Sequence, residues 1–186
     1  MTTQRLHTTV RDWTAAQLST RSDEVLDVYA EAMAVPRPQA GARKTILATH
    51  TGRSGLRAVA GLAGDELVGI AYGHIGAPGQ WWHDQVETAL SRTLGPGPAA
   101  TWRGAFEVCE LHVRPAHQGS GLGRQLLDRL LADPGTDVVL LTTPDLETRA
   151  RGFYRAAGWV DLVRQMRFPG DPREFAVLGL RLAERP

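Results

Sequence analysis

A glycine-rich stretch between two regular elements constrains this chain more than any other feature. Residues 118–123 read Gln-Gly-Ser-Gly-Leu-Gly, with a strand-like segment before them and a helix with an apolar stripe after them. Three glycines at alternate positions add no side chain to a core, and each costs backbone entropy on folding. They do allow backbone N–H groups to converge where a helix begins, a geometry that binds phosphate. The stretch therefore predicts a phosphate-binding loop.

The spacing of this loop excludes the two commoner nucleotide-binding loops. Arg124 stands where the dinucleotide fingerprint needs its last glycine, and no Gly-Lys-Ser/Thr follows as a Walker loop requires. Arg124 opposes the dipole of the helix it begins, which makes better sense with an anion bound. An ordinary glycine-rich turn is the structural alternative.

Hydrophobic periodicity predicts a mixed order of strands and helices along the rest of the chain. We expect strands at residues 6–13, 56–62, 66–74, 105–113, 138–142, 159–168 and 175–182, the second and third of them forming a hairpin around residues 63–65. We expect helices at residues 22–33, capped by Ser22, at 43–50, at 84–94, capped by Asp84, at 122–131 and at 145–157. This order predicts an α+β fold, a mixed sheet with helices on its faces, and the 186 residues suit one domain spanning residues 1–186.

The charge and the composition of the chain limit the kinds of partner that it is expected to bind. The 21 Lys and Arg residues nearly balance the 20 Asp and Glu residues, so neither nucleic acid nor a membrane is an expected partner. The first ten residues lack the apolar core of a signal peptide, and Cys109 is the single cysteine, so we expect a cytoplasmic protein without an internal disulfide. His50, His74 and His117 show no ligand spacing, and we therefore predict no metal site.

Two motifs together resemble a known family. Gln-x-x-Gly-x-Gly at residues 118–123 resembles the acetyl-CoA pyrophosphate loop of the GNAT superfamily of N-acyltransferases. Ala150-x-x-Phe153-Tyr154-x-x-x-Gly158-Trp159 is similar to a second pattern of that family and follows in the family's order. The resemblance runs in detail from about residue 107 to residue 160. It implies a GNAT-like, mostly antiparallel central sheet with helices on both faces, a cofactor-binding core at about 105–160 and an inserted segment at about 76–100.

The resemblance also implies an activity: transfer of an acetyl group from acetyl-CoA to a primary amine by direct attack. We expect a small-molecule acceptor, with a peptide or protein amine as the alternative. The residues expected to bind acetyl-CoA are Leu111, His112, Val113, Gln118, Gly119, Ser120, Gly121, Leu122, Gly123 and Arg124. Tyr154 corresponds to the family's general acid, since a phenol with a pKa of about 10 stays protonated at neutral pH. Tyr154 also completes an apolar helix face, so a plain core role is the alternative.

Glu110 is the candidate general base. Strand alternation places it on one face with His112, and Leu111 on the other. Apolar neighbours are expected to desolvate the carboxylate and raise its pKa. The structural alternative is an ion pair with one of the many arginines. His112 is the second candidate base and Glu107 the third.

Several features leave the function open. Glu147 stands where the family pattern usually has asparagine, which puts one expected contact near the pantetheine arm in doubt. A non-catalytic acyl-CoA-binding module on the same fold is therefore the rival hypothesis, and an unrelated phosphate-binding domain a third. Trp81-Trp82-His83 predicts either a substrate pocket or an apolar patch that anchors the inserted helix or meets a second subunit in a homodimer. Cys109 is not expected to act as a nucleophile, because no histidine partner is indicated and its position is predicted to be buried.

Overall fold

The computed structural model describes residues 8–184 as seven strands with helices between them. Neighbouring strands follow the order β1-β2-β3-β4-β5-β7-β6. The β4–β5 ladder is parallel, whereas β1–β2, β2–β3, β5–β7 and β6–β7 are antiparallel. The predicted mixed, mostly antiparallel sheet is therefore confirmed.

The chain forms two compact units. The first contains the residues up to His74 together with Val108–Pro134, and the second contains Ile75–Glu107 and the residues from Gly135 onward. The prediction of a single domain over residues 1–186 remains a prediction.

The first unit is built on a three-stranded meander. Its β2–β3 hairpin turns at Gly64 and Asp65, as the sequence predicts, and Gly64 has the positive φ of 63° that this turn needs. Leu6 and His7, which the predicted first strand includes, lie outside the described residues. The elements of this unit are β1 (Thr8–Trp13), α1 (Ala15–Thr20), α2 (Ser22–Ala32), α3 (Arg37–Ala40), α4 (Arg43–Thr51), β2 (Arg57–Ala63), β3 (Glu66–Ile75, ending in the second unit), β4 (Phe106–Val113, beginning in the second unit), the 3₁₀ turn η1 (Pro115–His117) and α7 (Leu122–Leu130).

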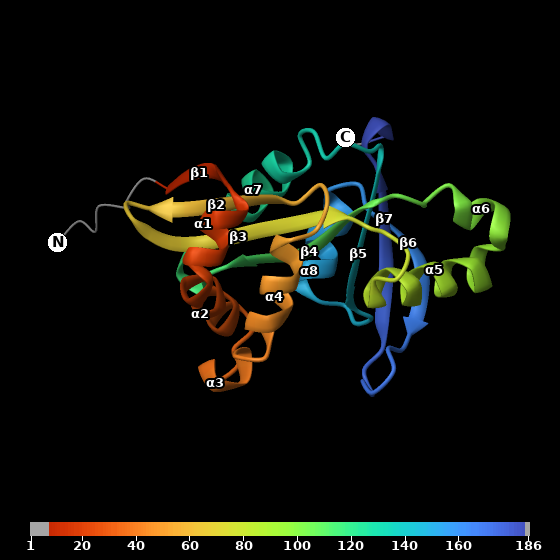
Figure 1. The fold of residues 1–186 in the computed structure, drawn as a ribbon, viewed down its shortest axis with the longest axis horizontal. Coiled ribbons are helices and arrows are strands. Elements are labelled where there is room, and N and C mark those ends of the chain that lie inside the picture. Colours follow the sequence, from red (N-terminus) through yellow and green to blue (C-terminus); the bar gives the residue numbers. More distant parts are fainter. Residues whose placement is uncertain (1–7, 185–186) are drawn as a thin grey trace. The chain divides into compact units, whose positions relative to one another are not determined.

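Helices cover both faces of this meander (Figure 1). On one face, α1, α2 and α4 supply Leu18, Val25 and Leu47 to a buried core shared with the strands. On the other face lies α7, which approaches so closely that a side chain at Gly61 or Gly69 would clash: a Cβ at either position would lie 2.9 Å from a leucine side chain of α7. Two strand glycines thus set the depth at which α7 packs.

The second unit has a core of its own. Buried side chains of α5 (Trp81–Leu94), including Val86 and Leu90, join strand residues such as Val163 and Val177. The strands β5 and β7 pair along their whole lengths, and β6 pairs irregularly with β7. The other elements of this unit are α6 (Pro96–Ala100), β5 (Val138–Pro144), α8 (Arg149–Ala156), β6 (Val160–Met166), β7 (Phe175–Arg181) and the 3₁₀ turn η2 (Leu182–Glu184).

Three predicted helix starts are wrong. Ser22 is the first residue of α2 rather than its cap, because a short helix, α1, precedes it and is itself capped by Thr14. The helix α5 begins three residues before Asp84, whose carboxylate instead accepts a hydrogen bond from the backbone N–H of Gly79 at 3.0 Å. The helix predicted from Asp145 begins at Arg149, because Asp145 is held in an ion-pair cluster.

No helix among the described residues is long and apolar enough to cross a bilayer.

Candidate functional site

The predicted glycine loop lies in the first unit, where it joins η1 to α7. Gly119 and Gly121 have positive φ angles of 76° and 87°, a region that other residues enter at a cost. Gly121 is the N-cap of α7 and has no side chain with which to cap it. The first backbone N–H groups of a helix lack intrahelical acceptors, so those of Gly121, Leu122, Gly123 and Arg124 point out of the helix start. This is the donor arrangement that binds phosphate.

Two polar side chains hold the loop in shape. The side-chain amide of Gln118 donates a hydrogen bond to the carbonyl oxygen of Val113 at 3.0 Å. The hydroxyl of Ser120 donates one to the carbonyl oxygen of His117 at 2.7 Å. Both bonds are internal to the loop and its preceding strand, so Gln118 and Ser120 brace the loop. Val113 is one of the residues expected to bind acetyl-CoA, and its carbonyl oxygen already accepts one of these bonds and has a second lone pair.

Arg124 lies in the first turn of α7, as predicted. Its Nε donates to Asp128 one turn further on, at 2.8 Å, and its side chain is 40% exposed. The ion pair directs the guanidinium along α7 toward Asp128, whose carboxylate balances its charge.

On β4, Glu110 and His112 lie on the same face, which confirms the predicted alternation. The Nε2 atom of His112 is 2.5 Å from Oε2 of Glu110. The other carboxylate oxygen pairs with Arg43 of α4. Arg43 in turn stacks over the ring of Tyr29, 4.3 Å from its centroid.

This geometry corrects one expectation for Glu110. Burial raises the pKa of its carboxyl, but the hydrogen bond from His112 and the charge of Arg43 outweigh burial and leave the pKa below its ordinary value. The predicted rise is wrong because the sequence does not show that Arg43, 67 residues away, reaches this strand. Glu110 is thus an ionised, ion-paired carboxylate with its side chain 14% exposed.

Glu110 and His112 line a small pocket within the first unit. Its walls are mostly apolar, and Arg43, Glu110 and His112 bring polar groups to it. The lining residues are Val25, Leu26, Tyr29, Arg43, Leu47, Tyr72, Glu110 and His112. Sequence reasoning missed Tyr29 and Arg43, because they lie on helices far from β4 in the chain and belong to no motif.

Tyr154 belongs to the second unit, on α8. Its half-buried ring makes edge contacts with Phe153 and Trp159, with centroids 5.2 and 5.6 Å away. The helix ends before Gly158, whose φ of 89° confirms the predicted stop. The apolar face predicted for this helix is wrong in part, because Ala150 is exposed while Arg151 is wholly buried.

Glu147, at the position where the family pattern has asparagine, precedes α8 and is not in its first turn. Its carboxylate pairs with Arg155 at 2.9 Å and is 74% exposed. An exposed pair of this kind contributes little to stability.

The third candidate base and the tryptophan pair also lie in the second unit. Glu107 is buried and lies 2.7 Å from Nδ1 of His83. Trp82 donates its indole N–H to Thr142 at 3.2 Å, whereas Trp81 is 57% exposed. Trp82 and His83 therefore anchor the start of α5, in agreement with the anchoring interpretation of this motif.

Comparisons with known proteins agree with the two motifs. A family model described as the acetyltransferase (GNAT) domain matches residues 64–161. The GCN5-like protein acetyltransferase Rv2170 of Mycobacterium tuberculosis is 37% identical over 198 residues, covering 92% of this chain and 96% of that protein.

Solved structures show the same fold. A GNAT-family structure from Desulfovibrio desulfuricans superposes with a TM-score of 0.67 at 18% identity, covering 95% of this chain and 99% of that one. The acetyltransferase-type protein YncA of Salmonella typhimurium, solved with acetyl-CoA, superposes with a TM-score of 0.58 at 16% identity, covering 95% and 94%. From its motifs, its sheet and these relatives, the chain belongs to the GNAT acetyltransferase family.

Proposed function

We propose that this acetyltransferase takes its acetyl group from acetyl-CoA and binds the pyrophosphate at the start of α7. The observation that carries the proposal is the glycine N-cap of that helix: four N–H groups converge there with no capping side chain. Arg124 lies in the first turn of the same helix. A protein solved with acetyl-CoA shares the fold, which supports the same donor here.

The proposed reaction is direct transfer to an amine. The nitrogen of the neutral acceptor forms a bond to the acetyl carbon while the carbon–sulfur bond breaks. The nitrogen then loses a proton to a base, and the departing thiolate gains one from an acid. We assign the acid to the phenol of Tyr154, which regains its proton from solvent. No covalent acyl-enzyme forms.

Glu110 is the proposed base, acting as a carboxylate rather than as a carboxylic acid. Its lowered pKa keeps it ionised and able to accept a proton, although the same shift makes it a weaker base. The Nε2–H of His112 donates a hydrogen bond to the Glu110 carboxylate at 2.5 Å and offers a route by which the proton leaves the pocket. Tyr29 and Arg43 fix both groups in place.

The acceptor has two candidates. The resemblance of the sequence to the family led us to expect a small-molecule amine first, and the pocket beside Glu110 is mostly apolar. The mycobacterial relative that matches nearly the whole chain is named a protein acetyltransferase, which favours an amine on a protein. We therefore propose a protein amine as the second candidate.

A single assay separates the candidates. Purified protein is incubated with acetyl-CoA and either a panel of small amines or a set of peptides with free N-termini and lysines, while free thiol is measured. Mass spectrometry then shows which acceptor has gained an acetyl group. Thiol release that depends on an acceptor supports the proposal, and the arm that shows it identifies the class.

Two other outcomes of the binding and transfer assays would contradict the proposal. Binding of CoA without transfer to any amine or peptide would point to a non-catalytic acyl-CoA-binding module on the same fold. Binding of ATP without binding of CoA would overturn the assignment of the loop to CoA.

A further inference from the structure

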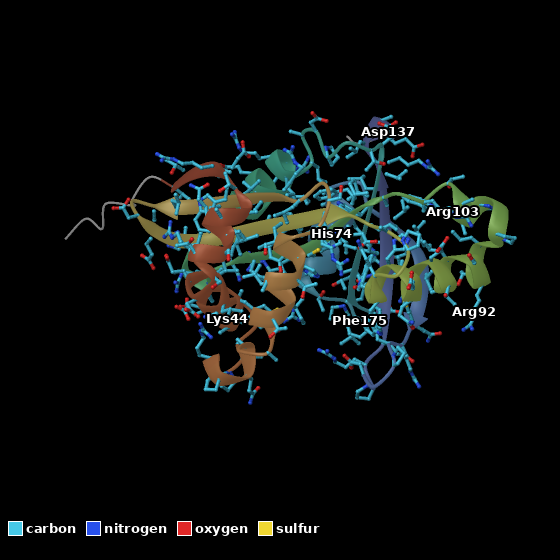
Figure 2. The ribbon with its side chains drawn as sticks, viewed as in Figure 1. Lys44, His74, Arg92, Arg103, Asp137 and Phe175 are labelled. Atoms are coloured by element: carbon cyan, nitrogen blue, oxygen red, sulfur yellow. The ribbon has the colours of Figure 1, made fainter. Side chains whose placement is uncertain are left out.

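Three metal-ligating side chains meet inside the first unit, although the sequence gives them no ligand spacing. They come from three elements: His50 from the last turn of α4, His74 from the end of β3 and Cys109 from the middle of β4. One ligand atom of each lies within 4.8 Å of the corresponding atoms of the other two. Figure 2 labels His74 near the end of β3.

The two imidazoles are packed against each other. Their ring centroids are 5.1 Å apart and the rings meet at 64°. His74 is 3% exposed, and the Nδ1 atom of His50 is buried with no hydrogen-bond partner. A buried polar atom without a partner costs about 1–3 kcal/mol. Most buried polar side-chain atoms do have a partner, so this nitrogen needs an explanation.

We propose that His50, His74 and Cys109 bind a divalent transition-metal ion of the zinc type. Two imidazole nitrogens and one thiolate sulfur suit Zn²⁺, and three protein ligands leave a fourth position for water or another small ligand. Binding gives the orphaned nitrogen of His50 a partner. The site takes no part in the acetyl transfer proposed above, and the proposal of a metal site does not depend on that activity.

The geometry needs a small adjustment to hold an ion. Bonds of about 2.0 Å to nitrogen and about 2.3 Å to sulfur place tetrahedral ligand atoms roughly 3.5 Å apart. His50 and Cys109 are partly exposed, so their side chains have room to rotate toward His74. On binding, the thiol of Cys109 forms the sulfur–metal bond and releases its proton to solvent.

Metal titration of the full chain, produced without a polyhistidine tag, tests this proposal. We expect one Zn²⁺ ion per chain by calorimetry. With Co²⁺ as the probe, we expect a thiolate-to-cobalt charge-transfer band together with the intense visible bands of a tetrahedral site. Cys109→Ser should abolish the charge-transfer band, and His50→Ala should weaken Zn²⁺ binding by more than about tenfold.

His117→Ala is the matched control, because His117 lies on η1 and outside the cluster. It should bind both ions as the unaltered protein does. Circular dichroism of each variant shows whether it is folded. We expect both variants to fold, because the side chains of His50 and Cys109 are partly exposed. Absence of Zn²⁺ binding, or binding that Cys109→Ser and His50→Ala leave unchanged, would overturn the proposal whatever the result of the acetylation assay.

Discussion

In the second unit, the guanidinium of Arg151 lies 2.5 Å from the carboxylate of Asp145, and both side chains are shielded from water, at 0% and 1% exposed. Asp145 also accepts hydrogen bonds from the backbone N–H of Gln165 at 2.7 Å and from Arg164 at 2.6 Å. The second nitrogen of Arg151 reaches Asp161 at 2.7 Å. A buried cation is thus balanced by two carboxylates where sequence periodicity predicts apolar packing.

Asp145→Asn should destabilise the protein strongly. Removing one partner of a buried ion pair leaves an uncompensated charge and costs about 3–5 kcal/mol. The free energy of unfolding, measured in urea, checks this. Glu87→Gln is the matched control, because Glu87 pairs with Arg103 in an exposed geometry and its loss should cost less than about 1 kcal/mol. Equal losses for the two variants would contradict the idea that burial makes the Asp145 pair important.

The same carboxylate should make stability sensitive to acid. Burial raises the pKa of Asp145, but the hydrogen bonds from Gln165, Arg151 and Arg164 outweigh burial and hold the pKa below its ordinary value of 3.8. Because the folded pKa is the lower one, the stabilisation is complete above pH about 4 and is lost as the pH falls through the folded value. Urea unfolding at a series of pH values from about 6 to about 3 should show this loss. Asp145→Asn should flatten the profile, and parallel profiles would show that other carboxylates are responsible.

This ion-pair cluster also shows where sequence reasoning stops. The positions of the strands, the β2–β3 hairpin and the helix after the glycine loop were predicted correctly, because each depends on local periodicity and turn residues. The start of α8 was not predicted correctly, because ion pairs with arginines later in the chain keep Asp145 out of the helix. A helical pattern that begins with Asp gives no sign of such partners.

Gly121→Ala should weaken the binding of CoA. The added methyl group meets nothing closer than 3.9 Å, so the effect would come from the backbone, whose φ of 87° costs an L-residue about 1–2 kcal/mol. We expect about a tenfold rise in the dissociation constant, measured by calorimetry. Gly64→Ala imposes a similar backbone strain, at a φ of 63° in the β2–β3 turn away from the loop, and should bind CoA nearly normally. If both variants bind CoA as the unaltered protein does, the pyrophosphate lies elsewhere.

Tyr154→Phe tests the proposed acid. Loss of a positioned general acid lowers kcat by about 10²–10⁴-fold, while the dissociation constant for CoA should hardly change. Trp159→Phe keeps an aromatic ring beside Tyr154 and controls for lost packing. An unchanged kcat in Tyr154→Phe would leave Tyr154 as a packing residue.

Glu110→Gln separates a base from a structural ion pair. If Glu110 accepts the proton of the amine, kcat should fall by about 10²–10⁴-fold. Arg43→Gln breaks the same ion pair but keeps the carboxylate, and should therefore cost much less. Similar losses of activity and of thermal stability in both variants would mean that Glu110 only holds α4 against β4.

Only those parts of the candidate site whose residues lie close together in the sequence could be predicted. The residues of the glycine loop and the shared face of Glu110 and His112 follow from spacing along a short segment. Arg43 and the cluster of His50, His74 and Cys109 do not, because they depend on which turn of α4 the fold brings against the strands. Such contacts between distant segments leave no periodic trace in a single sequence.

Neither of the two units is formed by one continuous stretch of the chain. The path passes from one unit to the other three times, inside β3 after His74, inside β4 after Glu107, and after Pro134. A single proteolytic nick therefore releases neither unit, and no contiguous fragment of the gene encodes one of them intact. Any truncation that discards the sequence after Pro134 removes three strands, β5, β6 and β7, whose side chains form the core that the inserted segment 76–100 shares, so the protein is best studied as an unbroken chain.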